Sequence, residues 1–316
     1  MIKIGVIGYG YWGPNIVRNF QNIKGCQVEM VADLASRHLE GIKTTQNYKD
    51  ILKNPQIKAV AIVTPAVTHY PLIKESLLAG KHVFTEKPLV LKVNQGKELI
   101  ALAKRKKRTL MVGHTFEYNP AVRKIKEILK RGGLGKPLFI YSKRLSLGPI
   151  RSDVSVIWDF AFHDISIMTY LLDKEPVRVS AREKYLLRRN VADAGFIELE
   201  FPNNIAAQIS VSWFYPIKER GTIIIGSKKM LVYDDINSEK PLTIYHHQGS
   251  SWLVKPKVSY PKIKKEEPLR IECQHFIDCI RKKKTPLTDG QRGLKIIKIL
   301  AAVQKSLDLN GRIINV

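Results

Sequence analysis

The sequence predicts an α/β protein in two parts: a doubly wound parallel sheet over residues 1–120, and an α+β domain with a mainly antiparallel sheet over residues 121–316. In the first part, short apolar runs alternate with helical patterns, which is typical of parallel βαβ units. The run 58–63 has no polar alternation, as expected for a strand covered on both faces. After Asn119-Pro120, several strand-like runs follow one another without helices between them, which favours antiparallel pairing.

The expected elements of the first part alternate along the chain. The strands are Ile2–Ile7, Gln27–Ala32, Ala59–Val63, His82–Thr85 and Leu110–Val112. The helices are Pro14–Gln21, Tyr48–Lys53, Tyr70–Ala79 and Asn94–Arg105. Gly80 follows the third helix, where it fits a C-cap.

The second part has a different texture. Its expected helices are Ala121–Arg131, the strongly patterned Ile157–Leu172, and the closing helices Leu269–Arg281 and Gly290–Leu307. Its expected strands are Pro137–Arg144, Val177–Ala181, Ala194–Phe201, Ala206–Trp213, Gly221–Ile225, Lys229–Tyr233 and Ile313–Val316. The polar stretch 245–268 is rich in proline and lysine and reads as a surface excursion.

Length and composition favour a soluble globular protein, because 44% of the 316 residues are hydrophobic and 26% are charged. The first strand begins at the N-terminus without a secretory signal, and no apolar run approaches the ~18 residues of a membrane span. We therefore expect a cytoplasmic protein without membrane association. The three cysteines, Cys26, Cys273 and Cys279, have no C-x-x-C spacing, so we expect no disulfide framework and no metal.

The chain is strongly basic: 53 Lys and Arg against 28 Asp and Glu give a net charge of +25. Short basic clusters occur at 104–108, 262–265 and 281–284. The first lies at the end of an expected helix and the third follows one, where cations suit the helix dipole. Because no nucleic-acid-binding motif accompanies them, we interpret the clusters as solvated faces and expect no nucleic-acid partner.

The run G-Y-G-Y-W-G at residues 8–13 directly follows the first expected strand and precedes a helix. In this context G-x-G-x-x-G predicts a dinucleotide site. The glycines permit the tight turn, the approach of a pyrophosphate and close helix packing, and the helix N-terminus faces the phosphates. Asp33 ends the next strand, where it would bind the ribose and favour NAD; nearby Arg37 leaves room for NADP. An ordinary strand-turn-helix is the alternative.

Lys87 follows the expected strand 82–85, within Thr85-Glu86-Lys87-Pro88. Ligands of open α/β sheets bind outside the carboxyl ends of the strands. A lysine there can hydrogen-bond a substrate hydroxyl and stabilise developing oxyanion character. A surface loop lysine is the alternative interpretation.

Asp159 and His163 have i, i+4 spacing, so on a helix they share one face. A carboxylate one turn from an imidazole orients it and raises its basicity, which suits a general base near neutral pH. The alternative is a helix cap followed by a histidine with a structural partner.

Together, these motifs resemble the Gfo/Idh/MocA oxidoreductases, the glucose-fructose oxidoreductase and inositol dehydrogenase superfamily. The resemblance covers essentially the whole chain and implies an N-terminal Rossmann domain, a second domain with a large open sheet, and oxidation of a secondary alcohol by NAD(P). It implies a hydroxyl-binding role for Lys87 and an acid/base role for His163 with Asp159 as its partner. The implied cofactor-binding residues are Gly8, Gly10, Tyr11, Trp12, Gly13, Asp33, Thr64, Pro65, His69, Glu86 and Lys87.

The segments 11–15, 113–116 and 153–159 resemble a subgroup that oxidises the C3 hydroxyl of UDP-N-acetylglucosamine. A nucleotide sugar is therefore the expected substrate, and a free sugar, sugar phosphate or inositol is the alternative. The chain departs from the family at Glu117-Tyr118, where many members have Arg-Phe, so the roles of nearby residues stay open. The expected substrate-binding residues are Lys87, His114, Tyr118, Arg144, Arg151, Asp159 and His163, with the arginines contacting phosphate or carboxylate.

The resemblance also implies a homo-oligomer, either a dimer or a tetramer. A competing hypothesis of another class is a non-catalytic NAD-binding sensor or a nucleic-acid-associated protein. It predicts salt-sensitive nucleic-acid binding and indifference to Lys87 and His163.

Overall fold

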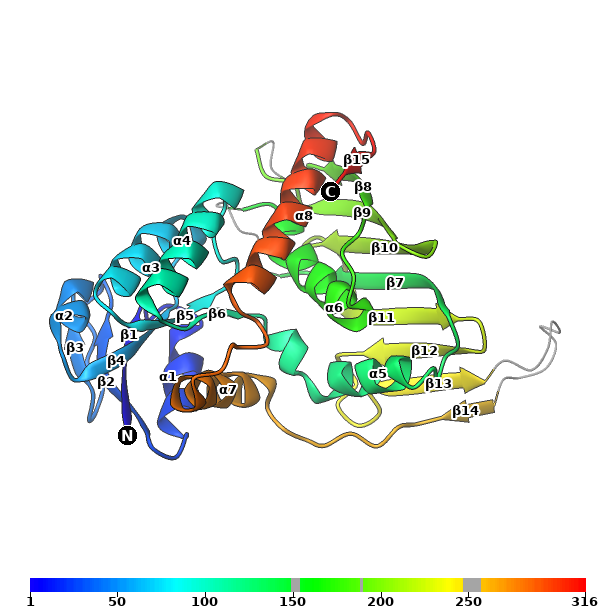
Figure 1. The fold of residues 1–316 in the computed structure, drawn as a ribbon. Coiled ribbons are helices and arrows are strands. Elements are labelled where there is room, and N and C mark those ends of the chain that lie inside the picture. Colours follow the sequence, from blue (N-terminus) through cyan, green and yellow to red (C-terminus); the bar gives the residue numbers. More distant parts are fainter. Residues whose placement is uncertain (149–153, 188–189, 247–256) are drawn as a thin grey trace. The chain divides into compact units, whose positions relative to one another are not determined.

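The computed structural model describes residues 1–148, 154–187, 190–246 and 257–316 (Figure 1). The chain forms two compact units: residues 1–118 with 266–297, and residues 119–265 with 298–316. The structure corrects the expected second domain of residues 121–316, because residues 266–297 belong to the first unit. The physical reason is a helix in this segment, α7, whose apolar side is buried in the core of the first unit.

The sheet of the first unit has six parallel strands in the order β3-β2-β1-β4-β5-β6. The strands are β1 (Ile2–Ile7), β2 (Cys26–Ala32), β3 (Lys43–Thr45), β4 (Ile57–Ile62), β5 (His82–Glu86) and β6 (Leu110–Gly113). The chain runs outward to β3 on one side and to β6 on the other, so the topology switches between β1 and β4. Ligands of doubly wound sheets bind beyond the strand ends at such a point.

Helices cover both faces of this sheet. On one face, α1 (Gly13–Gln21) and α7 (Pro268–Lys282) bury Phe20, Phe84 and Phe276, whose rings pack edge to face with centroids 5.8–6.1 Å apart. The other face is covered by α2 (Tyr48–Lys53), α3 (His69–Leu78) and α4 (Val93–Lys106). Burial on both sides explains why β1 and β4 are apolar from their third residue onward.

The second unit has a nine-stranded sheet in the order β14-β13-β12-β11-β7-β10-β9-β8-β15. Only the β7–β10 pair is parallel among the pairings of this sheet that the described residues form. The strands are β7 (Pro137–Leu145), β8 (Arg178–Lys184), β9 (Ala194–Phe201), β10 (Ile205–Ser212), β11 (Glu219–Gly226), β12 (Lys229–Asp234), β13 (Leu242–His246), β14 (Lys257–Ser259) and β15 (Ile314–Asn315). Helices α5 (Pro120–Lys130) and α6 (Phe162–Leu172) lie on one face of it (Figure 1).

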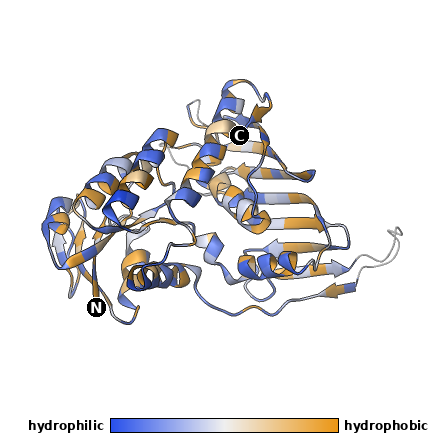
Figure 2. Ribbon diagram, in the orientation of Figure 1, coloured by the Kyte–Doolittle hydropathy of each residue, from blue (hydrophilic) through white to orange (hydrophobic). Residues whose placement is uncertain are grey.

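Hydrophobic and hydrophilic residues alternate along the strands of this second sheet (Figure 2). On β7, Ile140 and Ser142 are buried, whereas Tyr141 between them is 42% exposed. Tyr141 pairs with Ile223 of β11, which is also exposed. The sheet therefore has one face packed against helices and one open face that carries large apolar side chains.

The expected fold class is confirmed: a doubly wound parallel sheet is followed by a mixed, mainly antiparallel sheet. Three short strands, β3, β13 and β14, lie in segments where no strand was expected. Helix α8 (Gly290–Asp308) begins in the first unit and ends in the second. In the described part of the chain, no helix is both long enough and apolar enough to cross a membrane.

Candidate functional site

The glycine loop after β1 has the geometry of a phosphate-binding turn. Gly8 has φ = 97°, and a Cβ there would lie 2.6 Å from the carbonyl oxygen of Val63, so only glycine fits. A Cβ on Gly13 would lie 2.9 Å from Gly8 O, so this glycine lets α1 start against the loop. A Cβ on Gly10, by contrast, would meet no atom within 4 Å. The space above Gly10 is open at the N-terminus of α1, where the backbone N–H groups favour an anion.

A groove of about 530 Å3 continues from this loop along the first unit. Its lining residues come from the segments that follow β1, β2, β3 and β4, and from α2 and α3: they include Gly8, Gly10, Asp33, Leu34, Gln46, Tyr48, Thr64, Pro65 and Thr68. The volume falls within the range of small-molecule sites, roughly 300–1,000 Å3. The groove therefore has the place and size expected for the adenosine half of a dinucleotide.

Asp33 is fixed at the end of β2 by three contacts. Its Oδ2 accepts a hydrogen bond of 2.6 Å from Tyr9 N, and its Oδ1 accepts one of 3.0 Å from Ala35 N. Arg37 Nε lies 3.3 Å from the same Oδ1. The carboxylate thus faces the groove in a held orientation, where it can accept hydrogen bonds from ribose hydroxyls and repel a 2′-phosphate.

One of the two aromatic residues between Gly10 and Gly13 contacts Glu86. Tyr11 is 96% exposed, and Trp12 donates a hydrogen bond of 2.9 Å from Nε1 to Glu86 Oε1. Glu86 ends β5, and its Oε2 lies 3.3 Å from the backbone N of Lys87. Burial raises the pKa of Glu86 to about 7, although the charge of Lys87 and these hydrogen bonds act to lower the pKa. Lys87 follows β5 directly and is partly exposed, at the carboxyl edge of the sheet.

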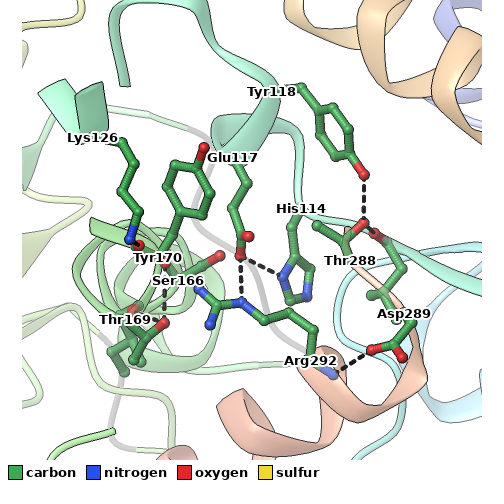
Figure 3. Close-up of polar contacts among 12 residues, drawn as sticks. His114, Glu117, Tyr118, Lys126, Ser166, Thr169, Tyr170, Thr288, Asp289 and Arg292 are labelled. Carbon is green, nitrogen blue, oxygen red and sulfur yellow. Dashed lines mark hydrogen bonds and ion pairs between the residues drawn. The ribbon is translucent and has the colours of Figure 1, made fainter. Parts of the chain in front are cut away.

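The segment after β6 is held in part by two residues that the sequence did not single out, Glu272 and Arg292. His114 Nδ1 and Arg292 Nε lie 3.2 and 3.1 Å from the same oxygen of the buried Glu117 (Figure 3). Thr115 donates a hydrogen bond of 2.7 Å to Glu272, which is also fully buried. The pKa of Glu272 lies well above its ordinary value, mainly because the carboxyl group is buried and also because Glu86 is a nearby negative charge.

These contacts correct two expectations about substrate-binding residues. His114 is 1% exposed and forms part of the Glu117 network. Tyr118 is fully buried, and its hydroxyl lies 3.1 Å from the Thr288 hydroxyl (Figure 3). Both side chains pack within the first unit and support the segment after β6, so the structure gives them no surface for a substrate.

His69 also differs from its expected place on the cofactor groove. It is 1% exposed, and its ring nitrogens lie 2.7 Å from the carbonyl oxygen of Pro88 and 2.9 Å from that of Thr64. Burial lowers the pKa of the imidazole. His69 therefore links the loop after β4 to the loop after β5 through these two carbonyl groups. Thr64 and Pro65 themselves line the groove.

In the second unit, Asp159 and His163 lie where α6 begins. The expected helix is present, but its first turn, Ile157–Ala161, is a π-helix, and α6 continues from Phe162. Asp159 and His163 are both partly exposed, whereas Phe162 and Asp164 are buried. Widened turns of this kind are frequent at functional sites. Both side chains are accessible to a ligand of this unit.

The structure contradicts the expected phosphate contact of Arg144. This residue lies on the buried side of β7 and is 5% exposed. Its Nε and Nη2 donate hydrogen bonds of 2.9 and 3.2 Å to the two carboxylate oxygens of Asp164, which is 1% exposed. The second expected arginine, Arg151, lies outside the described residues. Among the described residues, no group of three His, Cys, Asp or Glu side chains could hold a metal ion.

Comparison with known proteins agrees with this geometry. Residues 2–114 match the family described as "Oxidoreductase family, NAD-binding Rossmann fold", and residues 122–232 match the "GFO/IDH/MocA C-terminal domain". The scyllo-inositol 2-dehydrogenase (NAD(+)) of Bacillus subtilis is 27% identical, covering 91% of this chain and 87% of its own. The UDP-N-acetylglucosamine 3-dehydrogenase of Acidithiobacillus ferrooxidans is 26% identical and covers 97% of both chains.

A solved structure extends the comparison to the fold. The scyllo-inositol dehydrogenase of Lactobacillus casei, with bound NAD(H) and scyllo-inositol, aligns with a TM-score of 0.82 at 21% identity. The alignment covers 100% of this chain and 99% of that one. At this identity the likeness concerns the fold.

Proposed function

The chain belongs to the Gfo/Idh/MocA oxidoreductases, an enzyme family that acts on CH–OH groups with an NAD-binding Rossmann domain, and from this premise we propose that it is an NAD-dependent sugar 3-dehydrogenase acting on a UDP-linked amino sugar. The observation that carries the enzymatic part is Lys87, which stands at the carboxyl edge of the parallel sheet, directly after the last residue of β5, Glu86. That edge is the ligand-binding edge of doubly wound sheets.

The cofactor part is supported by the glycine loop. NAD supplies the hydride acceptor when it is bound. The open space at Gly10 and the N-terminus of α1 fit a pyrophosphate, and Asp33 fits an unphosphorylated ribose. Glu86 and Trp12 fit the nicotinamide side, because their hydrogen bond fixes both side chains next to Lys87.

In the proposed reaction, Lys87 donates a hydrogen bond to the reacting hydroxyl oxygen. Its ammonium group stabilises the negative charge that develops on this oxygen as the proton leaves. His163 accepts that proton as the general base, and Asp159 orients the imidazole and stabilises its charged form. The partial exposure of both residues at the start of α6 supports these roles.

The choice of a nucleotide sugar rests on the likeness to the UDP-N-acetylglucosamine 3-dehydrogenase of Acidithiobacillus ferrooxidans. At 26% identity, a competing substrate class has comparable support: the Bacillus subtilis relative, 27% identical, is a scyllo-inositol dehydrogenase. Inositol, a free sugar or a sugar phosphate is therefore the second candidate. Both candidates share the chemistry of Lys87 and His163.

The test is NADH formation by the purified protein with UDP-N-acetylglucosamine, free hexoses and inositol offered separately. A 3-keto-sugar aminotransferase is added in the nucleotide-sugar assay, so that an unfavourable equilibrium does not hide turnover. We expect activity with the nucleotide sugar, and a loss of at least about a hundredfold in kcat for Lys87→Ala and for His163→Asn. Lys92→Ala, an exposed lysine nearby, is the control that retains activity.

Other outcomes assign the function differently. Turnover of inositol or a free sugar alone would move the substrate to the second class and leave the chemistry in place. No turnover of any substrate, with intact NAD binding, would contradict the dehydrogenase and favour the sensor hypothesis. Activity that survives in Lys87→Ala would contradict the proposed role of this lysine.

We also propose that the open face of the second sheet binds a second copy of the chain. Tyr141, Phe196 and Ile223 are 42%, 52% and 39% exposed there, and β-sheet register places Tyr141 opposite Ile223. Exposed aromatic and aliphatic clusters of this kind mark protein interfaces. Light scattering should give a dimer or tetramer for the natural protein and a monomer for Tyr141→Lys/Ile223→Lys; an unchanged mass would contradict this interface.

A further inference from the structure

Two basic clusters that are far apart in the sequence meet in the first unit. The first lies at the end of α4, which terminates at Lys106, and the second lies at the end of α7, which terminates at Lys282. Residues of both clusters line one cavity of about 730 Å3, together with residues that precede and begin α8. The dinucleotide function described above uses neither cluster.

The cavity wall is strongly cationic. Five of its side chains are basic, and one is acidic: the basic residues are Lys104, Lys107, Arg108, Lys283 and Lys284. The acidic residue, Asp289, accepts a hydrogen bond from the backbone N of Arg292. Within the described part of the chain, none of the four lysines forms a salt bridge. Like charges gathered in a concave wall repel one another and raise the local concentration of anions.

Helix capping accounts for only part of this arrangement. A cation near a helix C-terminus interacts favourably with the helix dipole, and the effect fades beyond the last turn. The last turn of α4 holds Lys104, Arg105 and Lys106, but only Lys104 of these lines the cavity. Lys283 and Lys284 follow the end of α7. The dipoles therefore explain basic helix ends, but not the convergence of two ends on one cavity.

The remainder of the cavity is apolar or uncharged. Its apolar lining residues are Ile100, Leu110, Ile280 and Pro286, which are buried or half-buried. The His82 imidazole also lines it, and its Nδ1 accepts a hydrogen bond of 3.0 Å from Thr109 N. Burial, followed by the charge of Arg108, lowers the pKa of His82 to about 4, so the ring is neutral at pH 7. Exposed cations beside a buried apolar lining match a ligand with phosphates and a flat apolar group.

The cavity is separate from the dinucleotide groove. His82 begins β5 and Leu110 begins β6, so the cavity lies at the amino edge of the parallel sheet. The glycine loop, Asp33 and Lys87 follow the carboxyl ends of their strands. Because all strands of this sheet are parallel, the two edges are opposite, and the two sites have no lining residue in common.

We propose that this cavity is a second ligand site, which binds a small molecule bearing a polyphosphate chain, of the nucleoside polyphosphate class. The volume suits one such molecule, since small-ligand pockets measure roughly 300–1,000 Å3. The lysines contact the phosphates, and a base packs against the apolar lining residues. A concave site of this size favours a compact ligand over a nucleic-acid duplex.

The experiment is isothermal titration calorimetry on the full-length protein saturated with NAD, at about 0.15 M salt. Sodium tripolyphosphate and GTP are the two probes, because neither contains the adenosine that fits the dinucleotide groove. The cavity variant is Lys104→Gln/Lys107→Gln/Lys283→Gln/Lys284→Gln. The control variant removes the same charge from exposed lysines of the second unit: Lys257→Gln/Lys262→Gln/Lys264→Gln/Lys265→Gln.

We expect saturable binding at one site, weakened by at least about tenfold in the cavity variant and by less than about twofold in the control. Tighter binding of GTP than of tripolyphosphate would support the nucleotide class, and equal binding would contradict the contact with a base and leave a site for inorganic polyphosphate. All eight lysines are exposed, so both variants should fold; a double variant, Lys107→Gln/Lys284→Gln, replaces the quadruple one if thermal unfolding shows a loss of stability.

Three results would overturn the proposal. Absence of saturable binding to the natural protein would contradict the site. Equal weakening in both quadruple variants would show diffuse attraction to a basic protein. Tighter binding of a DNA duplex than of either probe, with a steep salt dependence that the cavity variant reduces, would replace the small ligand by nucleic acid.

Discussion

The carboxyl group of Glu86 should make the stability of the protein depend on pH in a way that a glutamine does not. Burial raises its pKa from an ordinary 4.5 to about 7. Between these values, the unfolded chain has released a proton that the folded protein still holds. The stabilising contribution is therefore complete below pH 4.5 and is lost as the pH rises through about 7. At about 1.4 kcal/mol per pKa unit, the loss is ~3.4 kcal/mol.

The assay is urea unfolding of the natural protein and of Glu86→Gln, without NAD, at several values between pH 4.5 and 8.5. Glutamine keeps the acceptor for Trp12 Nε1 and loses the titration. The advantage of the natural protein over the variant should decrease by up to about 3 kcal/mol across this range. Glu266→Gln, an exposed glutamate of the same unit, is the control. A difference for Glu86→Gln that does not change with pH would refute the reasoning.

Three other predictions follow from burial and local geometry. Gly10→Ala should leave the melting temperature within about 2 °C, because its Cβ enters open space, and should abolish NAD binding in a fluorescence titration, because that space is the one proposed for the pyrophosphate. Gly8→Ala should instead unfold at a lower temperature. Equal NAD binding by Gly10→Ala and the natural protein would contradict this prediction. Arg144→Ala leaves the Asp164 carboxylate buried, so urea unfolding should show a loss of about 3–5 kcal/mol, and a loss below about 1 kcal/mol would count against the ion pair. Burial raises the pKa of Cys26 to about 12, so this thiol should not react with a thiol reagent at pH 8 until the protein unfolds. Rapid labelling of Cys26 in the native protein, shown by peptide mapping, would disprove its burial.

Much of the fold follows from local patterns. Strands Ile2–Ile7 and Ala194–Phe201 have the same ends in sequence and structure, since the first is apolar except for Lys3 and the second ends in an apolar-polar alternation from Ile197 to Phe201. Strands Lys43–Thr45 and Lys257–Ser259 have three residues each and no buried side chain, so nothing in their sequence marks them. The periodicity of Leu269–Arg281 predicts an amphipathic helix, but it does not say which sheet the apolar side covers.

In the candidate site, too, residues close together in the sequence could be predicted and residues far apart could not. The glycine loop and Asp33 are set by spacing within 26 residues, so the sequence alone predicts them. Glu272 and Arg292 support the segment after β6 from 157 and 175 residues away, a distance that no local motif spans. Arg144 shows a third limit: its neighbour Lys143 is exposed on the same strand, and a register difference of one residue decides which side chain is buried.

The return of residues 266–297 to the first unit has a consequence for the order in which this protein forms during synthesis. The Rossmann sheet is complete by residue 113, but Phe276, which closes the cluster of three phenylalanine rings, is made 163 residues later. A ribosome must therefore produce every strand of the second sheet except β15 before the nucleotide-binding half gains its last layer. Until then, the apolar side chains that face α7 stay uncovered, which gives chaperones a defined surface and a defined interval in which to bind.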